Sequence, residues 1–250
     1  METKKDLRLA VLIDADNIPY SNVKGMMEEI AKYGTPTFKR IYGDWTKPTL
    51  SGWKTVLLEN AITPIQQYSY TTGKNSSDSA MIIDAMDILY SGRADGFCIV
   101  SSDSDFTRLA TRLREAGMQV YGIGQKKTPH PFIVACDKFI YLEIIASFSA
   151  ETVTVTKETA TPAKPSPPAK EDKELIQLIA ATIADLADEN GWAFLGEVGA
   201  LLLKKKPDFD PRNYGFVKLT PLIKSLNRFD IDERETDKKT IKLIYIRVKQ

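Results

Sequence analysis

Short apolar runs alternate with amphipathic segments over the first 145 residues of the chain. Apolar runs of this length between polar residues are typical of strands in a buried parallel sheet. The predicted strands are 7–13, 37–42, 62–68, 96–101, 118–123 and 138–142. The predicted helices between them are 21–33, 50–60, 78–91, 104–116 and 129–136. Strands that alternate with helices indicate βαβ units, so we expect an α/β domain with a mostly parallel sheet.

The pattern changes near residue 149. Residues 149–172 are rich in Pro, Ala, Thr and Lys and offer little to bury, which predicts a linker. A short edge strand at 152–156 is the weaker interpretation of its first part. We therefore expect a first domain at 1–148, a linker at 149–172 and a second domain at 173–250.

The second domain has the pattern of a winged helix. Apolar residues from Leu175 to Leu186 recur on one face of a helix. Two more helices are predicted at 195–205 and 217–226. The segments 229–231 and 241–248 then predict two strands around a polar turn, and helices followed by a hairpin form a small winged-helix domain.

Acidic residues follow two of the predicted strands. Asp14 comes directly after the first strand, and Asp103 follows the strand at 96–101. Ligands of open α/β sheets bind outside the carboxyl ends of the strands, so these side chains would face one crevice. Asp78 opens a helix, and Asp105 follows Asp103 by two residues. Converging carboxylates need a counter-charge, and a hard cation such as Mg²⁺ or Mn²⁺ supplies it through oxygen ligands.

Each acid also has a simpler interpretation. Asp78 and Asp105 suit the first turn of a helix, where a negative charge is stabilised, and Asp16 suits the turn before Pro19. Asp84 is six residues after Asp78, which places it about 120° round an ideal helix. We therefore expect Asp84 to be a partly buried or paired supporting residue. Only the occurrence of several acids at one sheet edge favours a common site.

Three motifs in order resemble the NYN domain of the PIN-like nuclease superfamily, in its bacterial LabA/DUF88 branch. They are Leu12-Ile-Asp14-Ala-Asp16-Asn17, then Lys74-x-x-x-Asp78 with Asp84, then Val100-Ser-Ser-Asp103-Ser-Asp105-Phe106. The resemblance covers about residues 7–145. It implies a PIN-like Rossmannoid parallel sheet, in strand order 3-2-1-4-5, with helices on both faces. It also implies a ribonuclease that depends on a divalent metal.

The resemblance assigns roles to these residues. The implied catalytic and metal-binding residues are Asp14, Asp78, Asp103 and Asp105, with Mg²⁺ or Mn²⁺ as the ion. Asp16 and Asp84 are expected to support them. Asn17 matches the asparagine of the family, which would touch the substrate or a metal-bound water. Lys74, Ser101 and Ser102 are also expected to bind the substrate.

Two further motifs resemble the OST-HTH or LOTUS domain over residues 175–249. They are Gly191-Trp-Ala-Phe-Leu195-Gly-Glu-Val-Gly199 and Pro207-Asp-Phe-Asp210-Pro-Arg-Asn-Tyr-Gly215-Phe. The resemblance implies a winged helix that binds RNA, including structured G-rich RNA, and it allows a homodimer or a protein partner through this domain. Lys204, Lys205, Lys206 and Arg212 are the candidate phosphate contacts. A solvated helix C-terminus explains the lysine run equally well.

The net charge, the lack of long apolar stretches and the two cysteines exclude several classes of function. A net charge of +1 gives no overall electrostatic attraction to nucleic acid, so any RNA contact must come from local patches. The chain has no apolar stretch long enough to span a bilayer and no N-terminal signal-peptide pattern, so we expect a cytoplasmic protein without membrane contact. Cys98 and Cys136 lie in apolar segments and are expected to be buried thiols.

The leading hypothesis is a metal-dependent ribonuclease with a tethered RNA-binding domain. One alternative is a catalytically idle RNA-binding or regulatory protein that keeps both folds. Another is a phosphatase of the haloacid-dehalogenase type, because Asp14-x-Asp16 after a strand resembles the nucleophile and acid of that class. Ile18 stands where that class requires a Thr or Ser, which argues against it.

Overall fold

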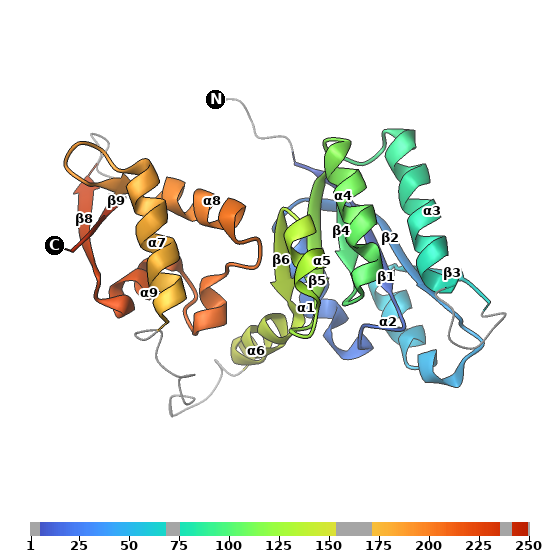
Figure 1. The fold of residues 1–250 in the computed structure, drawn as a ribbon. Helices are drawn as coiled ribbons and strands as arrows, with labels where there is room; N and C mark the ends of the chain where they lie inside the picture. The colour runs from blue at the N-terminus through green and yellow to red at the C-terminus, as the bar shows by residue number, and fades with distance from the viewer. Residues whose placement is uncertain (1–5, 69–75, 154–171, 236–241, 250) are drawn as a thin grey trace. The chain divides into compact units, whose positions relative to one another are not determined.

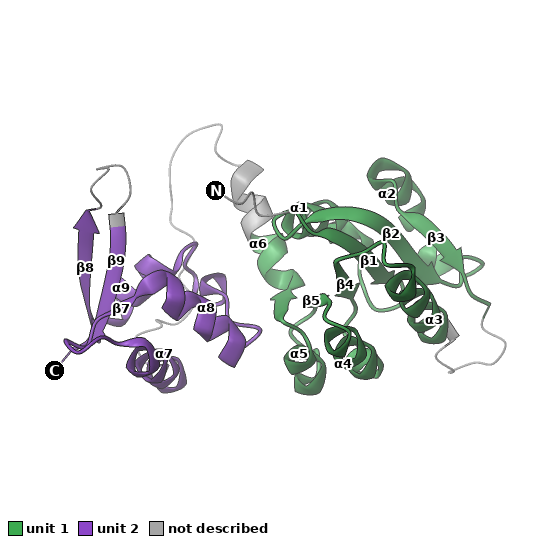
Figure 2. Cartoon of the chain, turned by 90° about the horizontal axis from the view of Figure 1, so that it is seen from above, with its two compact units in different colours: residues 1–156 green, residues 157–250 purple. Residues whose placement is uncertain are grey.

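The computed structural model describes residues 6–68, 76–153, 172–235 and 242–249 (Figure 1). The chain divides into two compact units, Met1–Thr156 (unit 1) and Lys157–Gln250 (unit 2) (Figure 2). Among the described residues, no helix has the length and hydrophobicity needed to cross a membrane.

Unit 1 is built on a parallel sheet of six strands in the order β3-β2-β1-β4-β5-β6. The strands are β1 Arg8–Asp14, β2 Thr35–Gly43, β3 Thr63–Gln66, β4 Gly96–Val100, β5 Gln119–Gly124 and β6 Lys138–Tyr141. The predicted α/β fold is confirmed. The strand order that the family resemblance implied is also found, with β6 added beside β5.

Helices cover both faces of this sheet (Figure 2). One face carries α1 Val23–Ile30, α2 Trp53–Asn60 and α6 Leu142–Val153. The other carries α3 Ser76–Ser91, α4 Thr107–Glu115 and α5 His130–Ala135. Alternate residues of β1 enter the two cores, with Val11 and Ile13 on the α1 side and Leu12 on the α3 side. The same alternation directs Asp14 toward the α3 side.

The helix α6 was not predicted from the sequence. It runs from Leu142 to Val153, so residues 149–153, assigned to the linker, are helical. The edge strand expected at 152–156 is wrong for its first two residues, and the other three lie outside the described residues. Leu142, Ile144 and Ile145 are buried, and Leu142 and Ile145 join the hydrophobic core on the α1 side of the sheet. The Pro- and Thr-rich composition that follows hid this short apolar face.

Unit 2 packs helices against one side of a small antiparallel sheet (Figure 1). The helices are α7 Lys173–Leu186, α8 Leu195–Lys205 and α9 Leu219–Leu226. The sheet has the order β7-β9-β8, with β7 Ala193–Phe194, β8 Phe229–Glu235 and β9 Lys242–Val248. The winged-helix prediction is confirmed. The strand β7 was missed because a two-residue strand has no periodicity of its own.

Candidate metal centre

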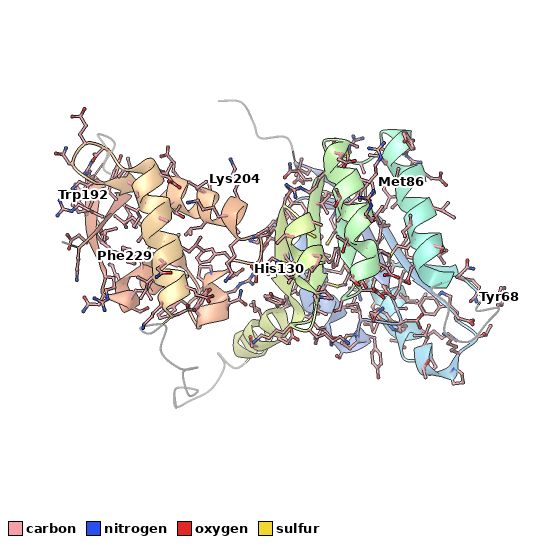
Figure 3. All side chains as sticks on the ribbon, viewed as in Figure 1. Tyr68, Met86, His130, Trp192, Lys204 and Phe229 are labelled. Atoms are coloured by element: carbon pink, nitrogen blue, oxygen red, sulfur yellow. The ribbon has the colours of Figure 1, made fainter. Side chains whose placement is uncertain are left out.

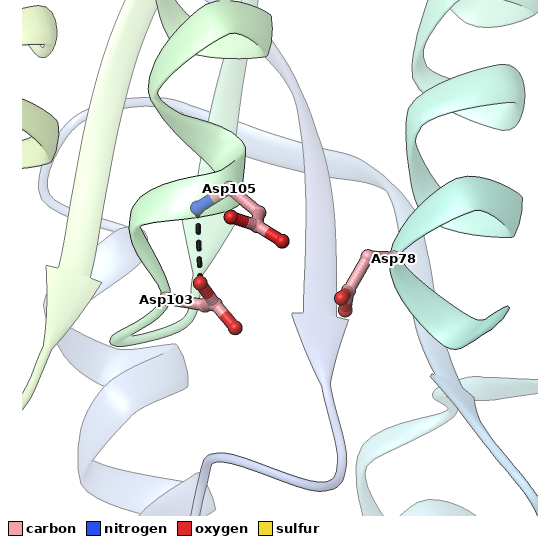
Figure 4. Close-up of side chains that lie close together, drawn as sticks. All are labelled: Asp78, Asp103 and Asp105. Atoms are coloured by element: carbon pink, nitrogen blue, oxygen red, sulfur yellow. Dashed lines mark hydrogen bonds between the residues drawn. The ribbon is translucent and has the colours of Figure 1, made fainter. Parts of the chain in front are cut away.

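Three carboxylates meet at the carboxyl edge of the sheet in unit 1 (Figure 4). One oxygen each of Asp78, Asp103 and Asp105 lies within 4.8 Å of the others. Asp78 comes from the first turn of α3, whereas Asp103 and Asp105 follow β4. Asp78 is buried, Asp103 is half-buried and Asp105 is exposed, so the group opens to solvent on one side.

A short 3₁₀ helix fixes the two acids that follow β4. Asp103 precedes this helix, and its Oδ1 accepts a hydrogen bond of 2.9 Å from the backbone N–H of Asp105 (Figure 4). Phe106, the last residue of the helix, is fully buried among α4 and the sheet. The capping bond and the buried ring together hold both carboxylates at the sheet edge.

Asp14 is not one of the three acids whose oxygens lie within 4.8 Å of one another, but its charge acts on Asp78. The residue is 1 % exposed, and both of its carboxylate oxygens accept hydrogen bonds. The Asp16 backbone N–H donates to Oδ1 over 3.1 Å, while Asn17 Nδ2 and Ser101 Oγ donate to Oδ2 over 2.6 and 2.7 Å. Ser101 Oγ in turn accepts the N–H of Asp103 over 3.1 Å. Asp14 is therefore connected through Ser101 to the Asp103 turn.

The electrostatics of the group call for a cation. Burial first, and then the negative charges of Asp14, Asp103, Asp105 and Asp16, together raise the pKa of Asp78 to about 6. Burial also raises the pKa of Asp14, against the lowering effect of its hydrogen bonds. Carboxylate oxygens from three side chains are the donors that Mg²⁺ and Mn²⁺ prefer. The residues present therefore fit a hard divalent cation.

The remaining predicted residues of unit 1 take different positions. Asp16 is exposed, and Lys47 Nζ is 3.8 Å from its Oδ1. The Asn17 amide is directed to Asp14, as described above. Ser102 is buried, and its Oγ accepts the backbone N–H of Gln125 over 2.9 Å, which connects the ends of β4 and β5. Lys74 lies outside the described residues.

Asp84 anchors α3 to the sheet and is not part of the group. Its carboxylate accepts hydrogen bonds from the Arg40 guanidinium and from the Tyr42 hydroxyl, both on β2. Burial and the bond to Asp84 raise the pKa of Tyr42 well above its ordinary value. Sequence reasoning missed Arg40 and Tyr42. Their two-residue spacing, which places both on one face of a strand, was the available signal.

The four basic residues predicted for unit 2 separate into two kinds. Arg212 makes a bidentate pair with Asp210 at 3.0 and 2.7 Å, and their side chains are only 13 % and 8 % exposed. Lys205 Nζ is 2.5 Å from Asp185 Oδ2. Lys204 is exposed near the end of α8 (Figure 3), and Lys206 is half-buried and hydrogen-bonded to Tyr214. Arg212, Lys205 and Lys206 thus have partners within the unit.

Comparison with known families agrees with this geometry. The family model of the NYN domain matches residues 8–143, and that of the OST-HTH/LOTUS domain matches residues 166–241. The chain belongs to the NYN domain family and carries an OST-HTH/LOTUS domain after it. NYN domains are PIN-like nucleases and OST-HTH domains bind RNA, so the combination supports a nuclease-like or RNA-binding role.

Similar solved structures come from three bacteria. A protein of unknown function from Vibrio parahaemolyticus is 18% identical, with 56% of this chain and 96% of that chain covered and a TM-score of 0.47. An uncharacterized protein from Nitrosomonas europaea is 34% identical over 38% of this chain and 90% of that chain, with a TM-score of 0.30. A protein fragment from Chromobacterium violaceum is 30% identical over 35% of this chain and 87% of that chain, with a TM-score of 0.25. No curated protein matches the chain.

Proposed function

We propose that the protein is a metal-dependent ribonuclease, in which unit 1 hydrolyses phosphodiester bonds of RNA and unit 2 binds the RNA. The observation that carries the proposal is the convergence of Asp78, Asp103 and Asp105 within 4.8 Å at the edge of an NYN-type sheet. Family membership supports the nuclease chemistry, and the acidic group supports the need for a divalent cation.

Within this proposal, Asp78, Asp103 and Asp105 would hold Mg²⁺ or Mn²⁺. A bound divalent ion supplies positive charge that activates water and stabilises the charge on the reacting phosphate. Asp14 would support the group through Ser101, because its bond to Ser101 fixes the hydroxyl that receives the Asp103 N–H. The open side at Asp105 is where the RNA phosphate would approach.

The environment of Asp14 argues against the phosphatase alternative. A nucleophilic aspartate must present an oxygen to the phosphorus atom of its substrate. Asp14 is 1 % exposed, and both of its oxygens already accept hydrogen bonds. The idle RNA-binding alternative keeps the same geometry and differs only in the outcome of the cleavage test.

For unit 2 we propose Lys204 and Lys206 as phosphate contacts at the end of α8. Both lysines lie at the C-terminal end of α8, and Lys204 is exposed there. Lys205 and Arg212, which pair with Asp185 and Asp210, are better explained as structural residues. A homodimer, or a protein partner bound through unit 2, stays a prediction from the family resemblance, as does the cytoplasmic location.

The test is cleavage of a labelled single-stranded RNA by the full-length protein. We expect cleavage with Mn²⁺ or Mg²⁺, products that carry a 5′-phosphate, and complete inhibition by a chelator. Asp103→Asn should lower the rate by orders of magnitude, whereas Asp87→Asn, on the exposed side of α3, should leave it unchanged. RNA binding without cleavage under every metal condition would establish the idle alternative, and chelator-resistant cleavage would contradict the metal mechanism.

A further inference from the structure

The outer face of the sheet in unit 2 carries aromatic side chains that do not belong to the core. Along β9, Ile244 and Ile246 pack toward the helices, so Tyr245 and Arg247 point to the opposite face. Phe194 of β7 pairs with Tyr245, and their ring centroids are 5.7 Å apart. Trp192 directly precedes β7 (Figure 3). None of these three rings is part of the hydrophobic core of the unit, and all three are half-buried.

Arginine side chains alternate with these rings. The Arg234 guanidinium lies 4.0 Å from the centroid of Tyr245 and 5.8 Å from that of Trp192. The guanidinium of Arg247 also contacts Trp192, at 4.6 Å from the ring centroid. Tyr245, Arg234, Trp192 and Arg247 thus form a series of flat groups, which we call the sheet-face ladder. Aromatic rings and guanidinium planes are the two protein surfaces on which nucleobases stack.

The turn before β7 holds Trp192 in place. Asp188 Oδ1 accepts the backbone N–H groups of Asn190 and Trp192, each over 2.9 Å. Gly191 has a φ of +80°, which a side chain would strain, so the turn depends on glycine here. A ring fixed by its own backbone loses little conformational entropy when a ligand stacks on it.

The charges of this face are balanced, which separates it from a phosphate-binding patch. Asp232 pairs with Arg234 at 2.8 Å and Asp230 pairs with Arg247 at 3.1 Å. The two arginines therefore present flat surfaces without a net positive charge. A face with balanced charges attracts RNA phosphates only weakly. An RNA strand would therefore bind it mainly by stacking its bases on the flat side chains.

A hollow adjoins the ladder at Arg247. It has a volume of about 550 Å³ and is lined by residues that include Asn190, Gly191 and Arg247. The Nε of Arg247 is buried and has no hydrogen-bond acceptor among the described residues. Because this Nε is covered, a base edge in the hollow would accept its hydrogen bond only after the Arg247 side chain shifts.

We propose that the sheet-face ladder binds unpaired nucleobases of single-stranded RNA, and that the hollow beside Arg247 receives the edge of one base. The inference rests on the RNA substrate of the proposed function and does not involve the metal centre. It assigns unit 2 a surface that reads bases, separate from the lysines at the end of α8.

The test compares two labelled strands of equal length, one single-stranded RNA and one abasic, by fluorescence anisotropy. The full-length protein is used with a chelator present, so that no strand is cut. Wild type should bind the RNA at least about tenfold more tightly than the abasic strand, since each stacked base contributes on this scale. Arg234→Lys retains the charge but loses the planar guanidinium, so it should remove most of this difference and leave binding of the abasic strand unchanged.

Arg228→Lys is the matched control, because Arg228 is an exposed arginine of the same unit with no ring contact in the described structure. It should bind both strands as wild type does, and the melting temperatures of both variants should match that of wild type. Unchanged RNA affinity of Arg234→Lys would overturn the ladder proposal and would favour a protein as the occupant of this face. Equal binding of both strands by wild type would also overturn it. Neither result would affect metal-dependent cleavage, which tests the proposed function separately.

Discussion

Ser101 Oγ donates a hydrogen bond of 2.7 Å to Oδ2 of Asp14, across the paired strands β1 and β4. The same oxygen accepts the backbone N–H of Asp103 over 3.1 Å. Both Ser101 and Asp14 are buried, so neither partner can exchange this bond for water. One hydroxyl group therefore joins the buried acid at the end of β1 to the turn that carries Asp103 and Asp105.

Ser101→Ala should damage both stability and catalysis. The change leaves Asp14 without one donor and leaves the Asp103 N–H without its acceptor, which costs about 1–3 kcal/mol. The pKa of Asp14 should rise further, because the Ser101 bond lowers it. We expect the rate of metal-dependent cleavage to fall more than the RNA affinity. Ser225→Ala, which removes a hydroxyl bonded to Leu222 in unit 2, should leave the cleavage rate unchanged.

The raised pKa of Asp78 predicts how the metal-free protein responds to pH. Its pKa of about 6 in the folded state exceeds its ordinary value of 3.8, so the protonated form favours folding. The stabilising contribution is complete below pH 3.8 and is lost as the pH rises through about 6. Above that pH, Asp78→Asn should have a higher free energy of unfolding than wild type, measured by urea denaturation with a chelator.

The difference in free energy of unfolding between Asp78→Asn and wild type should depend on pH and on bound metal. The stability difference between Asp78→Asn and wild type should shrink as the pH falls from neutral toward 4, because wild type becomes protonated. Mn²⁺ should stabilise wild type more than the variant, because the variant lacks one charged ligand of the ion and binds it more weakly. A difference that is constant over this pH range would contradict the assigned electrostatics.

Asp84→Asn should change stability in the opposite direction from Asp78→Asn, although both residues lie on α3. Asp84 is the acceptor for Arg40 and Tyr42, so the variant leaves a partly buried guanidinium without its counter-charge. We expect a loss of about 1–3 kcal/mol in the free energy of unfolding. Thermal denaturation of the two variants in parallel measures both stability changes. Changes of the same sign would contradict the assignment of Asp84 to anchoring α3 and of Asp78 to the metal site.

The sequence predicted the sheet, its parallel arrangement and the edge where the acids gather, because strand periodicity and strand-end position are local signals. It did not separate Asp14 from the other acids. Asp14 is buried and bonded to Ser101, which follows β4, and this contact joins segments that are distant in the sequence. The pairing of Arg212 with Asp210 was hidden for another reason. A bidentate pair two residues apart depends on the 3₁₀ turn at Pro211–Tyr214, and no periodicity reveals that turn.

Separating the two units should separate chemistry from affinity. A fragment of residues 1–153 contains the whole acidic group and the complete α6. It should keep metal-dependent cleavage but require higher RNA concentrations, because unit 2 no longer raises the local concentration of RNA. The ratio of the Michaelis constants of fragment and full-length protein measures this effect. An unchanged constant would indicate that unit 2 does not recruit RNA.

The central claim is that Asp78, Asp103 and Asp105 together hold a divalent cation. Titration of the metal-free protein with Mn²⁺, followed by calorimetry or by electron paramagnetic resonance, tests it most directly. Wild type and Asp87→Asn should bind Mn²⁺ with equal affinity, because Asp87 lies on the exposed side of α3. Asp103→Asn should lose at least about tenfold in affinity, since it removes one charged ligand of the ion. Binding of Mn²⁺ by Asp103→Asn as tightly as by wild type would contradict the account.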